Sequence, residues 1–170
     1  ITDTSGEDFI VYGADHAALN YCVVYGGGVK LDGVTNMTMK ENVIYSPILD
    51  YEALYLLNGS SENQFENNMF YSASDGATQA VVRISQNCSS NVFINNTLHR
   101  LYYRSYLLSG YRPSVVRLEP YTYTNQFINN ILYSTFVNTS TSTTGNAYTT
   151  WYGFYADSTA DFSGINEPAK

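Results

Sequence analysis

The sequence predicts an all-β protein, a right-handed parallel β-solenoid of about five stacked rungs. Three observations lead to this fold class: an asparagine-centred motif that recurs along the chain, an apolar strand motif that precedes each copy, and the lack of any convincing helical period. The chain has 170 residues, which is enough for one domain with a buried core.

The asparagine motif consists of an apolar residue, an asparagine three positions later, and an apolar residue two positions after that. Four copies centre on an asparagine and a fifth has a cysteine in its place, so the key positions are Cys22, Asn42, Asn68, Asn96 and Asn130. The spacings between them are 20, 26, 28 and 34 residues. Such a variable period is typical of a solenoid whose loops grow at one corner without disturbing the stack.

The second motif is an apolar strand that precedes each asparagine motif by a nearly fixed distance. Its five copies lie at 9–11, 29–31, 54–57, 81–84 and 115–118. Each repeat therefore reads strand, turn, strand, asparagine turn, strand and variable loop. An antiparallel β-sandwich with Asn-rich turns is the alternative, and the shared phase of both motifs favours the solenoid.

Stacked rungs lie about 4.8 Å apart, so equivalent side chains should form ladders along the axis. We expect an asparagine ladder at one corner and a phenylalanine stack inside, because amides can bond from rung to rung and asparagine tolerates left-handed turns. The ladder should contain Asn42, Asn68, Asn96 and Asn130, and the stack Phe65, Phe93 and Phe127.

These motifs resemble the parallel β-helix repeat of the pectate-lyase-like and copper-site-maturation-like families, and the β-solenoids of extracellular surfaces and sheaths. The resemblance covers roughly residues 9–137. It implies a fold and no single activity, since that repeat serves lyases, hydrolases, epimerases, adhesins and surface-layer proteins. We assign 1–137 to the solenoid. Residues 138–170 are expected to form a polar linker and an aromatic tail that caps the solenoid or docks on a neighbour.

The composition is typical of an extracellular protein. The chain is rich in Ser, Thr, Asn and Tyr, its formal net charge is −7, and no basic cluster suggests nucleic-acid binding. No run of about 18 apolar residues predicts a membrane span. The first residues would suit a mature N-terminus left by signal cleavage. We therefore expect an extracellular, cell-surface or cell-envelope protein. Five glycosylation sequons occur, at Asn36, Asn58, Asn87, Asn95 and Asn138.

No catalytic constellation is visible in the sequence. The resemblance to β-helix lyases and hydrolases would imply clustered carboxylates with a basic residue, and the middle repeats carry few acids. His16 follows Asp15, which is compatible with a metal site but more typical of a surface turn. We expect no catalytic residues and no metal or cofactor, except that the acidic ends are compatible with Ca²⁺ held between subunits. The acids concerned are Asp3, Glu7, Asp8, Asp15, Asp157, Asp161 and Glu167.

Three cations share one place in the strand motif, just before its last apolar residue. Lys30, Arg83 and Arg117 should point outward by alternation, with the two arginines on adjacent rungs about 4.8 Å apart. Because like charges repel at that distance, we expect an anionic contact there. Glu119, an acidic glycan or a carboxylate of a neighbouring molecule would serve, and splayed surface arginines are the alternative.

The two cysteines fall at different corners and about three rungs apart, roughly 14 Å along the axis. An intrachain Cys22–Cys88 disulfide is therefore excluded by this register, since it needs Cα atoms within about 7 Å. We place Cys22 in the asparagine ladder and Cys88 in an outward turn. Both are candidates for a disulfide between chains.

Two functions remain open. The first is a structural subunit of a self-assembling extracellular polymer, such as a sheath, surface layer or fibre, with copies of itself as partner. It follows from the short solenoid, the missing catalytic groups and the lack of an obvious cap at either end. The second is a carbohydrate-binding or carbohydrate-cleaving domain of a larger protein. Its sugar contacts would be exposed tyrosines: Tyr102, Tyr103, Tyr106, Tyr111, Tyr121 and Tyr123.

Overall fold

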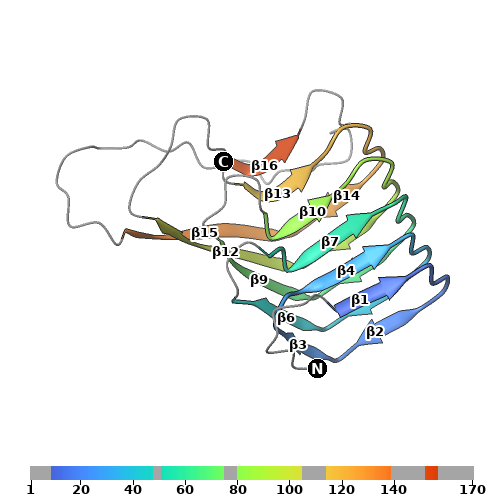
Figure 1. Ribbon diagram of the computed structural model, residues 1–170, viewed down its shortest axis with the longest axis horizontal. Coiled ribbons are helices and arrows are strands. Elements are labelled where there is room, and N and C mark those ends of the chain that lie inside the picture. Colours follow the sequence, from blue (N-terminus) through green and yellow to red (C-terminus); the bar gives the residue numbers. More distant parts are fainter. Residues whose placement is uncertain (1–8, 48–50, 75–79, 105–113, 139–151, 157–170) are drawn as a thin grey trace.

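The computed structural model describes residues 9–47, 51–74, 80–104, 114–138 and 152–156, and all sixteen of its strands lie in three parallel sheets (Figure 1). The first sheet contains β1 (Phe9–Tyr12), β4 (Val29–Asp32), β7 (Leu54–Leu57), β10 (Val82–Ile84), β13 (Ser114–Leu118) and β16 (Tyr152–Ala156). The second contains β2 (Ala18–Asn20), β5 (Thr38–Lys40), β8 (Gln64–Glu66), β11 (Val92–Ile94) and β14 (Gln126–Ile128). The third contains β3 (Val23–Tyr25), β6 (Val43–Ser46), β9 (Met69–Ser74), β12 (Thr97–Arg104) and β15 (Ile131–Asn138).

The fold is the predicted parallel β-solenoid. Three consecutive strands, one from each sheet, make one rung, and five complete rungs stack with each strand paired in parallel to its equivalents. The antiparallel sandwich is excluded for the described residues, because every strand pair among them is parallel. We call the turn between the first and second strands of a rung the first corner, and the next turn the second corner.

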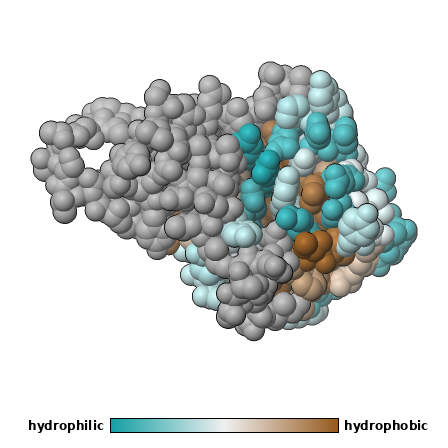
Figure 2. All heavy atoms as spheres, viewed as in Figure 1, coloured by the Kyte–Doolittle hydropathy of each residue, from teal (hydrophilic) through white to brown (hydrophobic). Residues whose placement is uncertain are grey.

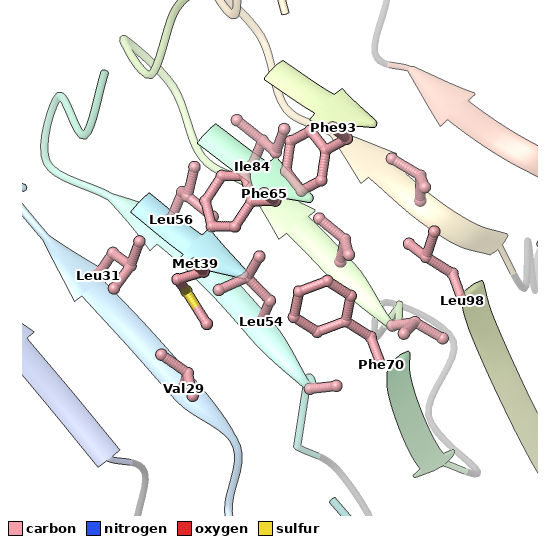
Figure 3. Packing of buried hydrophobic residues seen from close by; sticks show 14 of the residues in the cluster. Val29, Leu31, Met39, Leu54, Leu56, Phe65, Phe70, Ile84, Phe93 and Leu98 are labelled. Atoms are coloured by element: carbon pink, nitrogen blue, oxygen red, sulfur yellow. The ribbon is translucent and has the colours of Figure 1, made fainter. Parts of the chain in front are cut away.

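The core is a set of columns in which equivalent apolar residues lie above one another. Phe65, Phe93 and Phe127 stack face to face with ring centroids 4.4 Å apart at both steps, as the repeat predicted. Aliphatic side chains of the first and third sheets enclose this stack, among them Leu54 and Leu98 (Figure 3). One rung alone cannot cover its inward face, so the stack itself creates the core.

Both corners are built on residues with left-handed backbone. At the second corner the residue before each ladder position has φ between 54° and 56°: Tyr21, Glu41, Asn67, Asn95 and Asn129. At the first corner His16, Asn36, Glu62, Ser90 and Thr124 have φ between 53° and 59°. Asparagine reaches this region at least cost, which explains why it gathers at these turns.

The tail beyond residue 138 contributes one strand to the solenoid. β15 ends at Asn138, and β16 pairs in parallel with β13, so the first sheet has six strands while the other two have five. Residues 139–151 and 157–170 lie outside the described part of the chain. The described residues contain no helix of the length and apolarity that crossing a membrane would require.

Candidate functional site

The structure places the four predicted ladder asparagines in one hydrogen-bonded column at the second corner. Each carboxamide oxygen accepts the backbone N–H and the Nδ2 amide of the residue one rung earlier, as in Asn68 to Asn96 at 2.8 and 3.0 Å. The same pair of bonds joins Asn42 to Asn68 and Asn96 to Asn130. At the first rung only the N–H of Cys22 donates, to Asn42 Oδ1 at 2.9 Å.

A second asparagine ladder, which we did not predict, runs along the first corner. Asn63 donates its N–H and Nδ2 to Asn91 Oδ1, and Asn91 donates in the same way to Asn125 Oδ1. These asparagines are 0–2% exposed, so both corners bury amides whose hydrogen bonds are supplied by neighbouring rungs. The sequence contains a signal for this second ladder, because each of its asparagines lies two residues before a phenylalanine of the stack.

Two of the outward cations of the first sheet, Lys30 and Arg83, contact groups of the same chain. Arg83 donates to Glu119 through Nε at 2.7 Å and also through Nη2, and its Nη1 lies 3.4 Å from Glu52. The ring of Tyr55 lies between the two cations of neighbouring rungs, 4.7 Å from Arg83 Cζ and 5.8 Å from Lys30 Nζ. Glu119, one of the anions considered, binds Arg83, and Arg117 pairs with Arg83 in register on β13.

The predicted position of Cys88 in an outward turn is wrong. Its side chain is 0% exposed, and burial raises the pKa of its thiol to about 11. It occupies an inward column at the first corner with Val34, Ser60 and Thr122, which are also buried. An interchain bond through Cys88 would therefore require this corner to open. Cys22 is half-buried with its Sγ 3.2 Å from the Asn20 carbonyl, and both thiols are free.

Four of the five sequons lie at left-handed turn positions, with φ between 51° and 65°. Asn87 and Asn95 are exposed. Asn36 and Asn58 donate their amides to Asp15 and Asp32 at 2.9 and 2.7 Å. Asn138 is the last residue of β15. Glycosylation of these sites stays a prediction.

Asp15 lies in a small polar cluster at the first corner. Its carboxylate accepts hydrogen bonds from Asn36, Thr35 and His16, and these bonds, chiefly that of Asn36, lower its pKa to about 2. The described residues hold no group of three or more potential metal ligands. The other acids of the predicted Ca²⁺ sites, at 3–8 and 157–167, lie outside the described residues.

An aromatic column on the outer face of the third sheet was not predicted. Tyr25, Tyr45, Tyr71, His99 and Tyr133 follow the second-corner ladder positions by three residues and pair in register from β3 to β15. Consecutive centroids lie 4.1–5.3 Å apart, and all steps are stacked except the edge contact of Tyr71 with His99. The sequence signal for this column is the repeat spacing that also identified the ladder asparagines.

The stacked rings of this column use most of their faces on one another, and Tyr71 in its middle is buried. A sugar stacks on an aromatic face, and the two end rings, Tyr25 and Tyr133, each have one stacking neighbour among the described residues. Of the tyrosines named for sugar contacts, Tyr121 and Tyr123 are exposed, Tyr102 and Tyr103 lie in β12, and Tyr106 and Tyr111 fall outside the described residues. The described surface seen in Figure 2 is mostly hydrophilic, and its hydrophobic residues gather mainly in the lower part of the view.

In comparisons with known proteins, no family model, no curated protein and no solved structure matches this chain.

Proposed function

We propose that the chain is a structural subunit of an extracellular polymer, such as a sheath, surface layer or fibre, that grows by end-to-end stacking of solenoids. The observation that carries the proposal is the matching pair of strand edges at the two ends. Among the described strands, β2 pairs only with β5, and β14 pairs only with β11. A parallel strand at the end of a sheet, without a second neighbouring strand, can act as a template for another chain.

The two edges fit one another in register. Gln126 of β14 pairs with Val92 and donates to the Asn91 carbonyl at 2.9 Å. Ala18 holds the equivalent position in β2, and its partner Thr38 donates to Ala17, so the backbone groups of Ala18 itself point away from β5. In a stack, Ala18 of one copy would donate to the Asn125 carbonyl of another, as Gln126 donates to Asn91 within the chain.

The aromatic column supports the same end-to-end contact between two copies. Tyr25 begins it with 44% exposure and Tyr133 ends it with 42%. Stacking Tyr25 of one copy on Tyr133 of the next would continue the column at the spacing found inside the chain. Aromatic pairs of this kind contribute about 0.5–1.5 kcal/mol beyond their buried area.

The proposal is tested by blocking one edge. Ala18→Pro removes an N–H that the β2–β5 ladder does not use, whereas Ala18→Val keeps it and serves as the matched control. We expect filaments or sheets by electron microscopy for the native protein and the control, with a repeat of about 4.8 Å in fibre diffraction, and short oligomers for Ala18→Pro. A native protein that sediments as a monomer at high concentration would refute the proposal.

The carbohydrate-binding alternative has one observation in its favour. Tyr121 and Tyr123 are 50% and 46% exposed beside each other on the first corner of the fifth rung. Binding in a glycan array that is lost in Tyr121→Ala/Tyr123→Ala would favour this function over assembly.

A further inference from the structure

The outer face of the third sheet carries two columns of side chains that run through all five of its strands. The aromatic column is one of them. The other begins two residues earlier on each strand, points to the same side of the sheet, and is aliphatic apart from one threonine. Its members pair in register from β3 to β15: Val23, Val43, Met69, Thr97 and Ile131. We call the two columns together the apolar face.

The aliphatic column is open to the solvent along the stack. Val43 is 38% exposed, Met69 39% and Ile131 61%, and Thr97 is half-buried. The outer face of a sheet normally presents polar side chains to water, whereas here apolar side chains of successive rungs form a continuous row. A contiguous exposed apolar patch of this kind marks an interaction surface.

Charge distinguishes the apolar face from the other two outer faces. The outward positions of those faces include Lys30, Arg83 and Glu119 on the first sheet, and Lys40 and Glu66 on the second. The two columns of the apolar face contain no Asp, Glu, Lys or Arg, and burial lowers the pKa of His99 below its usual 6.5, so its ring is neutral at pH 7. Because the net charge of −7 makes copies of the chain repel one another, an uncharged face is the place where two of them can approach closely.

The period of the apolar face indicates its partner. Its side chains repeat at the spacing of the rungs, about 4.8 Å, and a second copy carries the same rows at the same spacing. The rows of one face can therefore fit between the rows of the other when the two sheets pack about 10 Å apart. We propose that the apolar face pairs with the apolar face of a second copy, side by side and related by a two-fold axis.

This pairing goes beyond the proposed function, because it uses a sheet face and does not depend on end-to-end stacking. In a polymer it would join neighbouring stacks laterally. The five strands of one face span only about 20 Å along the solenoid axis, so a single pair falls below the standard interface of about 1,600 Å². Pairing of single copies should therefore depend on concentration, and two stacks would be held together by many such faces.

The test uses Ala18→Pro as the background, since that change blocks one end of the solenoid and leaves the apolar face intact. Sedimentation equilibrium over a range of protein concentrations should show dimers of this protein. Met69→Lys in the same background places a charge at the centre of the face and should raise the dimer dissociation constant at least about tenfold. Gln64→Lys is the matched control, because it adds the same charge on the same rung at an outward position of the second sheet, and it should leave the dimer unchanged.

Val43→Lys is a second face variant, on the neighbouring strand β6. Urea unfolding shows whether each variant folds as the background does. Weaker pairing in a folded face variant, beside an unchanged control, supports the inference. A background protein that stays monomeric at every concentration, or a dimer that neither lysine weakens, would overturn it. Failure of both variants to fold would also overturn it, because side chains on an open face tolerate lysine.

The same proteins separate this inference from the proposed function. Filaments of the native protein without dimers of Ala18→Pro would leave end-to-end assembly standing and refute lateral pairing. Dimers in both proteins without filaments would do the reverse. A lipid surface is the other occupant of an apolar face, so phosphatidylcholine vesicles are included. Binding to vesicles that Met69→Lys abolishes, by a protein that remains monomeric, would refute pairing between copies.

Discussion

Replacing Asn96 by alanine removes an inner member of the second-corner ladder. The Asn96 carboxamide oxygen accepts the N–H and Nδ2 of Asn68, and its own Nδ2 donates to Asn130 Oδ1 and to the Phe65 carbonyl, both at 3.0 Å. Asn96→Ala therefore deletes four hydrogen bonds and replaces none of them.

The loss of stability follows from the polar groups that stay buried in the variant. Asn68 is 2% exposed, and in the variant its backbone N–H has no acceptor, while its Nδ2 keeps only the Met39 carbonyl. A buried donor left without a partner costs about 1–3 kcal/mol, and the Phe65 carbonyl loses a donor as well. We expect the free energy of unfolding to fall by roughly 2–4 kcal/mol.

The assay is equilibrium unfolding in urea, followed by circular dichroism, with comparison of the transition midpoints. Gln126→Ala is the control, because Gln126 is an exposed amide on β14 outside both ladders. It should change stability by less than about 0.5 kcal/mol. If Asn96→Ala unfolds at the same urea concentration as this control, the ladder does not stabilise the corner.

Three further predictions concern the core, the thiols and pH. Phe93→Ala should lower the unfolding free energy by about 3–5 kcal/mol, because it empties the middle of the phenylalanine stack; a change below 1 kcal/mol in urea unfolding would contradict the stack. In a thiol-labelling experiment at pH 8, Cys88 should react only as fast as the protein unfolds, and after Cys22; simultaneous labelling would refute its burial. Burial lowers the pKa of His99 below its usual 6.5, so the unfolded state binds the proton more readily. Thermal stability should therefore be full above about pH 6.5 and fall as the pH drops below it, and His99→Tyr should flatten that slope; equal slopes would refute the assignment.

The sequence predicted the fold because each rung repeats two independent signals in one phase. The second asparagine ladder follows the same repeat. It was missed because only three of the five rungs have an asparagine at that position. Ala17 and Met37 stand at the equivalent positions of the first two rungs, where Met37 donates its N–H to Asn63. A column that begins partway along a solenoid is hard to recognise until the register is known.

The error at Cys88 has a local physical cause. Alternation of inward and outward side chains holds along an extended strand, but the residue before Cys88, Asn87, has φ 65°. The prediction treated Cys88 as an outward turn residue, but a left-handed residue redirects the chain inside the corner and the next side chain can point inward. Comparison along the stack would have succeeded, because Ser60 and Thr122 precede and follow Cys88 by 28 and 34 residues, the spacings of the asparagine motif.

The polarity of the ladders bears on how copies could join. Every ladder oxygen accepts from the rung on its N-terminal side, so a copy stacked beyond Asn125 and Asn130 would have to supply two carboxamides. Its first rung offers Ala17 and Cys22 instead. A joint between copies would thus contain backbone and aromatic pairing without ladder amides, and it would be weaker than any internal step. A polymer built in this way should come apart at its joints before its subunits unfold.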